Sequence, residues 1–143
     1  MRAVAIGRHG GIDEVSVIDL AEPEVAGGQV RVRLRAAALN HLDLFVIAGI
    51  PGLELPMPHV IGADGAGIVS AVGEGVTSLD VGDEVVLDPG LGSPDEPGYA
   101  LLGEMVPGTF ADSVVVPVGS CHAKPTNLSW HQAAAFPLVT LTA

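Results

Sequence analysis

Two short stretches of the sequence carry the polar side chains that could take part in chemistry. One runs from Asn40 to Asp43, and the other runs from Gly62 to Gly67 and contains Asp64. The Asn40 carboxamide can cap a helix, and it can also donate a hydrogen bond to an acceptor oxygen. Asp64 can accept backbone N–H bonds in a turn or line a pocket. These two stretches therefore decide what chemistry the sequence can support.

The stretch from Gly62 to Gly67 holds three glycines in six residues, which let the backbone approach a neighbour closely or adopt a positive φ angle. A dinucleotide-binding loop would need the pattern G-x-G-x-x-G at the start of a helix. Here Ser70 takes the place of the third glycine, and the β-branched residues before it favour a strand. We conclude that this stretch is not a phosphate-binding loop.

The histidines and the cysteine do not have the spacing of a metal site. Apart from His41, which lies in the first of the two stretches, they are scattered singly, at His9, His59, Cys121, His122 and His131. A single cysteine excludes an internal disulfide and is typical of a protein in the reducing cytoplasm.

The composition limits the classes of function that the chain can have. It has 143 residues and a formal net charge of −11 with only six basic residues, which argues against nucleic acid or an anionic membrane surface as a partner. No stretch approaches the roughly 18 apolar residues of a membrane span, and the N-terminal apolar run is too short for a signal peptide. We therefore expect a soluble protein of the cytoplasm.

Short strands and turns dominate the predicted fold. Hydrophobic residues make up 48% of the sequence but aromatic residues only 3%, so the core must consist of valine, leucine, isoleucine and alanine. The 19 glycines and 11 prolines favour turns over long helices. The spacing of the strands indicates a β-barrel-like fold. Strands are predicted at residues 1–6, 15–20, 30–36 and 108–117, and another strand follows the glycines of residues 62–67. Helices are predicted at residues 40–49 and from Ser129 onward, and a loop is predicted at residues 88–107.

Residues 30–36 alternate strictly between apolar residues and three arginines, which places the arginines on one face of a strand. We expect a solvated face that offsets nearby carboxylates. An anion-binding site is the less favoured alternative.

The glycine-rich stretch resembles the signature of one enzyme family. Residues 62–73 and 82–85 are similar to the patterns G-H-E-x-x-G-x-V-x-x-V-G and G-D-x-V of medium-chain zinc-type alcohol dehydrogenases and quinone oxidoreductases. Residues 108–112 resemble the family's G-T-[FY]-A-[ED] segment. The resemblance covers the chain nearly end to end. It implies a mainly β fold, a GroES-like partly open β-barrel with short helices.

The resemblance also implies a division of the chain. Residues 1–128 would form the GroES-like catalytic domain, and residues 129–143 would begin a Rossmann domain that binds the nicotinamide cofactor. We therefore expect a longer parent enzyme, which forms a homo-oligomer, and no activity from these residues alone.

Zinc-dependent members of the family hold a catalytic zinc with a cysteine, a histidine and a more distal cysteine. Asn40 matches the first of these positions and Ala63 the second, whereas a catalytic zinc needs three protein ligands. Leu42 matches the hydroxyl residue that relays the alcohol proton. Residues 88–107 contain none of the four cysteines of the family's structural zinc. The resemblance therefore implies an enzyme without zinc.

Asn40 in place of cysteine is the pattern of the quinone oxidoreductase branch. It implies that Asn40 polarises a substrate carbonyl, with Asp43 and Asp64 as the other catalytic residues. By the same resemblance, His41 and Thr142 would approach the cofactor, which is NADPH or NADH. The apolar walls of the substrate pocket are expected to be Leu42, Phe45 and Pro56.

The leading interpretation is the catalytic domain of a zinc-independent NAD(P)H-dependent oxidoreductase that acts on quinone, enone or other carbonyl or alcohol substrates. One alternative is a domain of an alcohol dehydrogenase with alcohol or aldehyde substrates. An alternative from another class is a GroES-like binding module without enzymatic role, such as a co-chaperonin. Co-chaperonins lack counterparts of residues 40–43 and 129–143.

Overall fold

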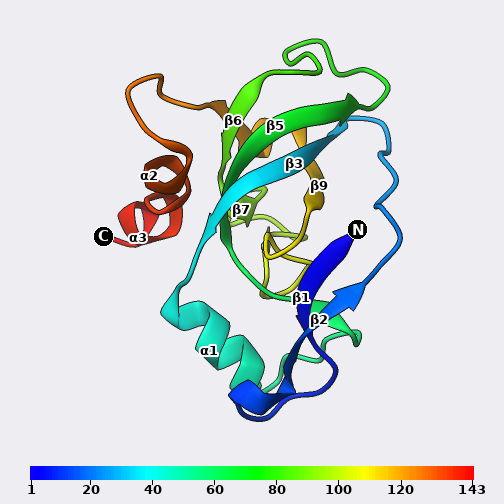
Figure 1. Ribbon diagram of the computed structural model, residues 1–143, viewed down its shortest axis with the longest axis vertical. Helices are drawn as coiled ribbons and strands as arrows, with labels where there is room; N and C mark the ends of the chain where they lie inside the picture. The colour runs from blue at the N-terminus through cyan, green and yellow to red at the C-terminus, as the bar shows by residue number, and fades with distance from the viewer.

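The computed structural model describes residues 1–143 as a set of short strands with a few short helices (Figure 1). The strands are β1 (Arg2–Ile6), β2 (Val15–Asp19), β3 (Gln29–Ala38), β4 (His59–Val60), β5 (Asp64–Val72), β6 (Glu84–Leu87), β7 (Gly90–Leu91), β8 (Ala100–Leu101), β9 (Ser113–Pro117) and β10 (Cys121–Ala123). The main sheet is antiparallel with the strand order β10-β6-β5-β3-β9. A second sheet has the order β2-β1-β4, and β7 pairs with β8. The mainly β class predicted from the sequence is confirmed.

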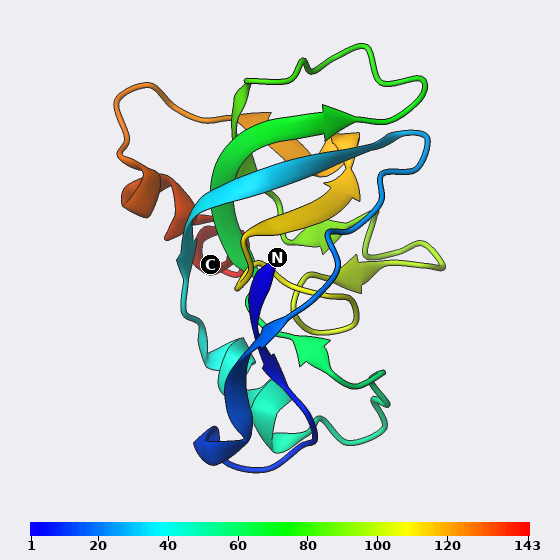
Figure 2. The same cartoon turned by 45° about the vertical axis from the view of Figure 1, so that its right-hand side comes forward.

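The three helices lie at two places on this scaffold. They are α1 (His41–Ala48), α2 (Trp130–Ala134) and α3 (Pro137–Leu141), and single 3₁₀ turns occur at Ile12–Glu14 and Val118–Ser120. In Figure 2, α2 and α3 flank the main sheet, whereas α1 lies at the end of the molecule near β1 and β2. None of the helices is both long and apolar enough to cross a membrane. The predicted helix between Asn40 and Gly49 is confirmed, since Gly49 ends α1 with a φ angle of +97°.

The core is built from aliphatic side chains, as the composition predicted. Along β3, Val30 and Val32 are fully buried, whereas Arg31 between them is half-buried and Arg33 and Arg35 are exposed. The largest cluster of buried residues contains no aromatic side chain and consists of Val30, Val32, Val69, Val85, Leu87, Leu102, Val114 and Val116. A smaller cluster, which includes Ile6, Val46 and Ile47, fixes α1 against β1. Strand alternation thus determines which face of each strand is inside.

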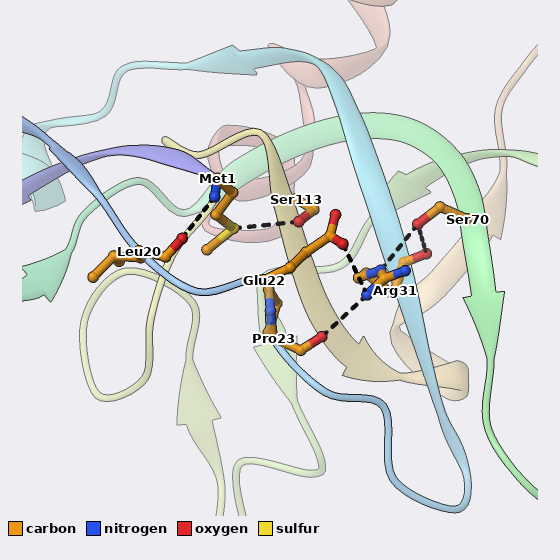
Figure 3. Close-up of polar contacts among 7 residues, drawn as sticks. All are labelled: Met1, Leu20, Glu22, Pro23, Arg31, Ser70 and Ser113. Atoms are coloured by element: carbon orange, nitrogen blue, oxygen red, sulfur yellow. Dashed lines mark hydrogen bonds and ion pairs between the residues drawn. The ribbon is translucent and has the colours of Figure 1, made fainter.

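Arg31 shows what the arginine face of β3 does (Figure 3). Its Nη1 lies 3.3 Å from Oε2 of Glu22, and it donates to the carbonyl oxygen of Pro23 at 3.4 Å. Its Nε donates to Oγ of Ser70 on the neighbouring strand at 3.4 Å. The expectation that this face offsets nearby carboxylates is confirmed for Arg31. These contacts tie the segment between β2 and β3 to the sheet.

Two parts of the predicted secondary structure need correction. The predicted loop at 88–107 contains the hairpin of β7 and β8. The predicted strand at 108–117 begins only at Ser113, because the backbone N–H groups of Gly108, Thr109 and Phe110 instead bond to the chain around Gly62. In addition, β10 was not predicted. It is a strand of three residues whose partner, β6, lies far away in the sequence.

The glycines between Gly62 and Gly67 are buried, and the neighbours that they approach belong to the protein itself. Gly62 has a φ angle of +99°, and an added Cβ would overlap the ring of Phe110. An added Cβ on Gly67 would overlap the backbone carbonyl of Arg33 on the paired strand β3. Close packing within the barrel therefore explains this glycine spacing.

The helix α2 is fixed to the barrel by packing and by a buried cation. Ala133 and Ala134 pack against Ala66 and Val86 of the main sheet. The Lys124 ammonium lies 4.9 Å from the centre of the Trp130 ring and 3.2 Å from Oε2 of Glu84. At the start of the helix, Ser129 and Gln132 form the predicted capping box.

We predict that Gly67→Ala lowers the free energy of unfolding by about 3 kcal/mol or more, because the methyl group meets backbone that cannot move aside. Gly7→Ala is the matched control, since a Cβ there has no neighbour within 4 Å. Urea denaturation of both variants measures the difference. Equal midpoints for the two variants would show that β3 and β5 can separate at this position without loss of stability.

Candidate active site

Asn40 lies at the start of α1 and makes two kinds of contact. It forms a capping box with Asp43, in which Oδ2 of Asp43 accepts the backbone N–H of Asn40 at 2.7 Å. Its side-chain Nδ2 donates to Oδ2 of Asp64 at 3.0 Å. A carboxamide carries two N–H donors, so one of them remains for another partner. Asn40 is thus the N-cap residue of α1, as predicted, and one of its side-chain N–H donors remains available.

Asp64 begins β5 and joins elements that are far apart in the sequence. Its Oδ1 accepts the backbone N–H of Leu138 in α3 at 2.9 Å, while Oδ2 accepts Nδ2 of Asn40. Its backbone carbonyl accepts the hydroxyl of Thr109 at 2.7 Å. Only 1% of the residue is exposed. Asp64 therefore serves as a buried acceptor between α1, β5 and α3.

The two carboxylates of the site have raised pKa values. Burial raises the pKa of Asp64, and the hydrogen bonds from Asn40 and Leu138 partly oppose this effect. Burial also raises the pKa of Asp43, against the backbone N–H groups of Asn40 and Gly62, and the charge of Asp64 raises it further. Burial disfavours the charged form of each group, so each of these carboxyl groups is harder to ionise here than in water.

A cavity of about 580 Å³ borders Asn40, His41 and Asp43. Its other walls are apolar and consist of Val4, Ile12, Val15, Leu39, Leu44, Ile47, Ile61, Phe110 and Val139. A mostly apolar cavity with a few placed polar groups is typical of a small-molecule site.

None of the three predicted apolar wall residues borders this cavity. Leu42 faces the other side of α1 and packs on the cluster around Ile6. Phe45 is 60% exposed, and Pro56 is exposed on the loop before β4. The walls at Leu39, Leu44 and Val139 come instead from the residue before the cap, the next turn of α1 and the distant helix α3.

The structure does not bring His41 and Thr142 together. His41 is exposed and borders the cavity of Asn40. Thr142 borders a separate cavity of about 350 Å³, and its hydroxyl donates to the carbonyl oxygen of Leu138 at 2.6 Å. This second cavity is also lined by Asp88 and Tyr99, which no motif in the sequence singles out.

The donor set at the matched ligand positions does not fit zinc. Ala63 is fully buried and presents a methyl group. The carboxamide of Asn40 is bonded to Asp64. No three side chains of histidine, cysteine, aspartate or glutamate lie close enough together to hold a metal ion. Cys121 packs against the main core, and burial raises the pKa of its thiol to about 12.

Comparisons with known proteins agree with the resemblance. Residues 26–126 match the family described as the alcohol dehydrogenase GroES-like domain. A zinc-type alcohol dehydrogenase-like protein of Schizosaccharomyces pombe is 37% identical over 146 residues, which cover 92% of this chain and 41% of that protein. The 2-methylene-furan-3-one reductase of Solanum lycopersicum is 35% identical over 145 residues, which cover 100% of this chain and 36% of the reductase.

A solved structure shares the fold closely. The crystal structure of an NAD-dependent alcohol dehydrogenase matches with a TM-score of 0.94 at 48% identity, over 99% of this chain and 45% of that chain. The chain thus spans less than half the length of each of these similar proteins. From the family match and this shared fold it follows that the chain belongs to the alcohol dehydrogenase GroES-like domain family, within the medium-chain dehydrogenases and reductases.

Proposed function

We propose that this chain is the substrate-side domain of a zinc-independent, NAD(P)H-dependent oxidoreductase that reduces a quinone, an enone or a related carbonyl compound. The observation that carries the proposal is the Asn40 carboxamide. It borders a mostly apolar cavity, and Asp64 holds one of its N–H groups. The second N–H is left for a substrate oxygen.

Asn40 would act by stabilising charge on the substrate. A bound nicotinamide would supply the hydride, and the carbonyl oxygen of the substrate would gain negative charge. An N–H group that is already oriented strengthens its hydrogen bond as this charge grows, which is worth about 2–4 kcal/mol in the transition state. The apolar walls of the cavity exclude water and so increase this effect.

The absence of suitable ligands supports a reaction without zinc. A catalytic zinc needs three protein ligands with one open position. Asn40 and Ala63 stand at two of these three positions, and neither is a suitable zinc ligand. No other group of three histidine, cysteine, aspartate or glutamate side chains could hold the metal ion instead. The name of the tomato relative, a furanone reductase, also fits an enone as substrate.

The cofactor would be held mainly by a further domain that begins near Ser129. The segment 129–143 would belong to that domain, while residues 1–128 form the substrate side. His41 and Thr142 remain the residues of this chain that we propose to approach NADPH or NADH. They border separate cavities, so one small ligand confined to either cavity would not contact both residues.

One observation favours the alternative of an alcohol or aldehyde substrate. The solved structure with 48% identity is described as an NAD-dependent alcohol dehydrogenase. Comparing kcat/KM for enones, quinones and aldehydes in reduction, and for primary and secondary alcohols in oxidation, separates the two. A preference for alcohols by tenfold or more, about 1.4 kcal/mol, would favour the alternative.

We predict that Asn40→Ala in the full-length enzyme lowers turnover by about tenfold or more. The free energy of unfolding should fall by about 1–3 kcal/mol, because Asp64 loses one of its two side-chain donors. Asn127→Ala is the matched control, since Asn127 is an exposed carboxamide in a loop. Wild-type turnover of Asn40→Ala on the best substrate would show that Asn40 is a helix cap only.

A second prediction is that the purified chain carries no stoichiometric zinc. The physical reason is the missing ligand set at Asn40 and Ala63. Metal analysis of untagged protein after dialysis measures the zinc content. One zinc per chain that resists mild chelation would contradict the assignment.

A third prediction is that the chain alone does not bind NADPH or NADH in the low micromolar range. Its glycine-rich stretch enters a strand and is packed against the protein, so its backbone N–H groups are not arranged for a pyrophosphate. Calorimetric titration with each cofactor tests this. Tight binding would reveal a nucleotide site within residues 1–143.

A further inference from the structure

Asp64 makes one side-chain hydrogen bond to each of two different helices. Oδ2 accepts Nδ2 of Asn40 in front of α1, and Oδ1 accepts the N–H of Leu138 in α3. Because only 1% of Asp64 is exposed, its carboxylate cannot contact a substrate itself. We propose that Asp64 is a positioning residue, which holds the Asn40 carboxamide by its nitrogen and fixes the direction of the remaining N–H. This inference rests on the proposed function of Asn40.

An ionised carboxylate selects one end of the carboxamide. It accepts hydrogen bonds and donates none, so only the nitrogen of Asn40 can face it at 3.0 Å. A carboxamide turned by half a rotation would bring two acceptor oxygens together and leave a buried acceptor without a donor. The charge of Asp64 thus selects the orientation in which the nitrogen of Asn40 faces it, and the capping box, in which the side chain of Asn40 accepts the backbone N–H of Asp43, favours the same orientation.

The carboxylate is itself prevented from rotating. The bond from Leu138 holds Oδ1, and the hydroxyl of Thr109 holds the backbone carbonyl of the same residue. Asn40 therefore points along a direction that depends on the position of α3 relative to β5. A shift of α3 away from the barrel would release the carboxylate and, through it, the carboxamide.

Few charged groups surround Asp64. Asp43 in α1 is coupled to it by charge, α3 has no charged residue, and the residue opposite on β3 is Ala38. When Asp64 takes up a proton at low pH, it gains an O–H donor that can bond to the oxygen of Asn40. Protonation should therefore weaken the preference for this orientation of the carboxamide.

The side-chain amide signals of the isotope-labelled chain give a direct test by NMR. The sequence has only four carboxamides, Gln29, Asn40, Asn127 and Gln132. We expect one N–H signal of Asn40 far downfield of those of Asn127 at neutral pH, and we expect it to move toward them on acidification and in Asp64→Asn. Since burial raises the pKa of Asp64, the midpoint should lie above the usual range of an aspartate. An Asn40 pair that resembles Asn127 and does not change with pH would overturn the proposal.

Kinetics of the full-length enzyme separate this inference from the proposed function. We expect Asp64→Asn to lower kcat by about tenfold with little change in KM, an effect of the size seen for groups that orient a functional residue. In the background of Asn40→Ala, the same substitution should have no further effect on kcat.

If both substitutions lower kcat additively, Asp64 does not act through Asn40. If Asn40→Ala lowers kcat and Asp64→Asn does not, Asn40 keeps its role and the positioning role of Asp64 is wrong. If Asn40→Ala has no effect, the proposed function fails, and the inference that rests on it fails with it.

Discussion

A buried carboxylate connects the parts of this fold that form the site. Taking an isolated charge out of water is strongly unfavourable, so Asp64 requires donors on both of its oxygens. These donors come from Asn40 in front of α1 and from Leu138 in α3, which are separated from it by 24 and 74 residues. Because loss of either donor leaves a buried acceptor unsatisfied, the positions of α1 and α3 on the barrel are energetically linked.

The glycines around Asp64 make this connection possible. The start of β5 lies so close to the segment 108–110 and to β3 that side chains at Gly62 and Gly67 would overlap other atoms. The same contacts bring Phe110 to the wall of the cavity and Thr109 to the backbone of Asp64. The glycine-rich signature is therefore a packing requirement of the barrel. Its effect on the site is indirect, through the position that it gives to Asp64.

The sequence predicts the features that depend on residue type and local spacing. Alternation predicts β3, and capping residues predict both the start of α1 and the start of α2. Other features depend on distant partners. The strand β10 forms because β6 offers an edge, and Leu138 enters the site through its backbone N–H, which any residue other than proline has. Leu44 rather than Leu42 borders the cavity, because Leu42 packs on the cluster around Ile6 and this packing fixes the rotation of α1 about its axis.

If the proposed function is right, the polar groups of the cavity suit a conjugated carbonyl substrate better than an alcohol. Oxidation of an alcohol requires a group that takes the hydroxyl proton. Leu42 cannot accept a proton. Asp43 is buried and bonded to the backbone of Asn40, so His41 at the rim is the remaining candidate base. A carboxamide neither gives nor takes a proton, but it donates a hydrogen bond to an oxygen that gains charge. Conjugation in an enone or quinone spreads this charge, so a single fixed donor can be sufficient where an isolated alkoxide would need a metal.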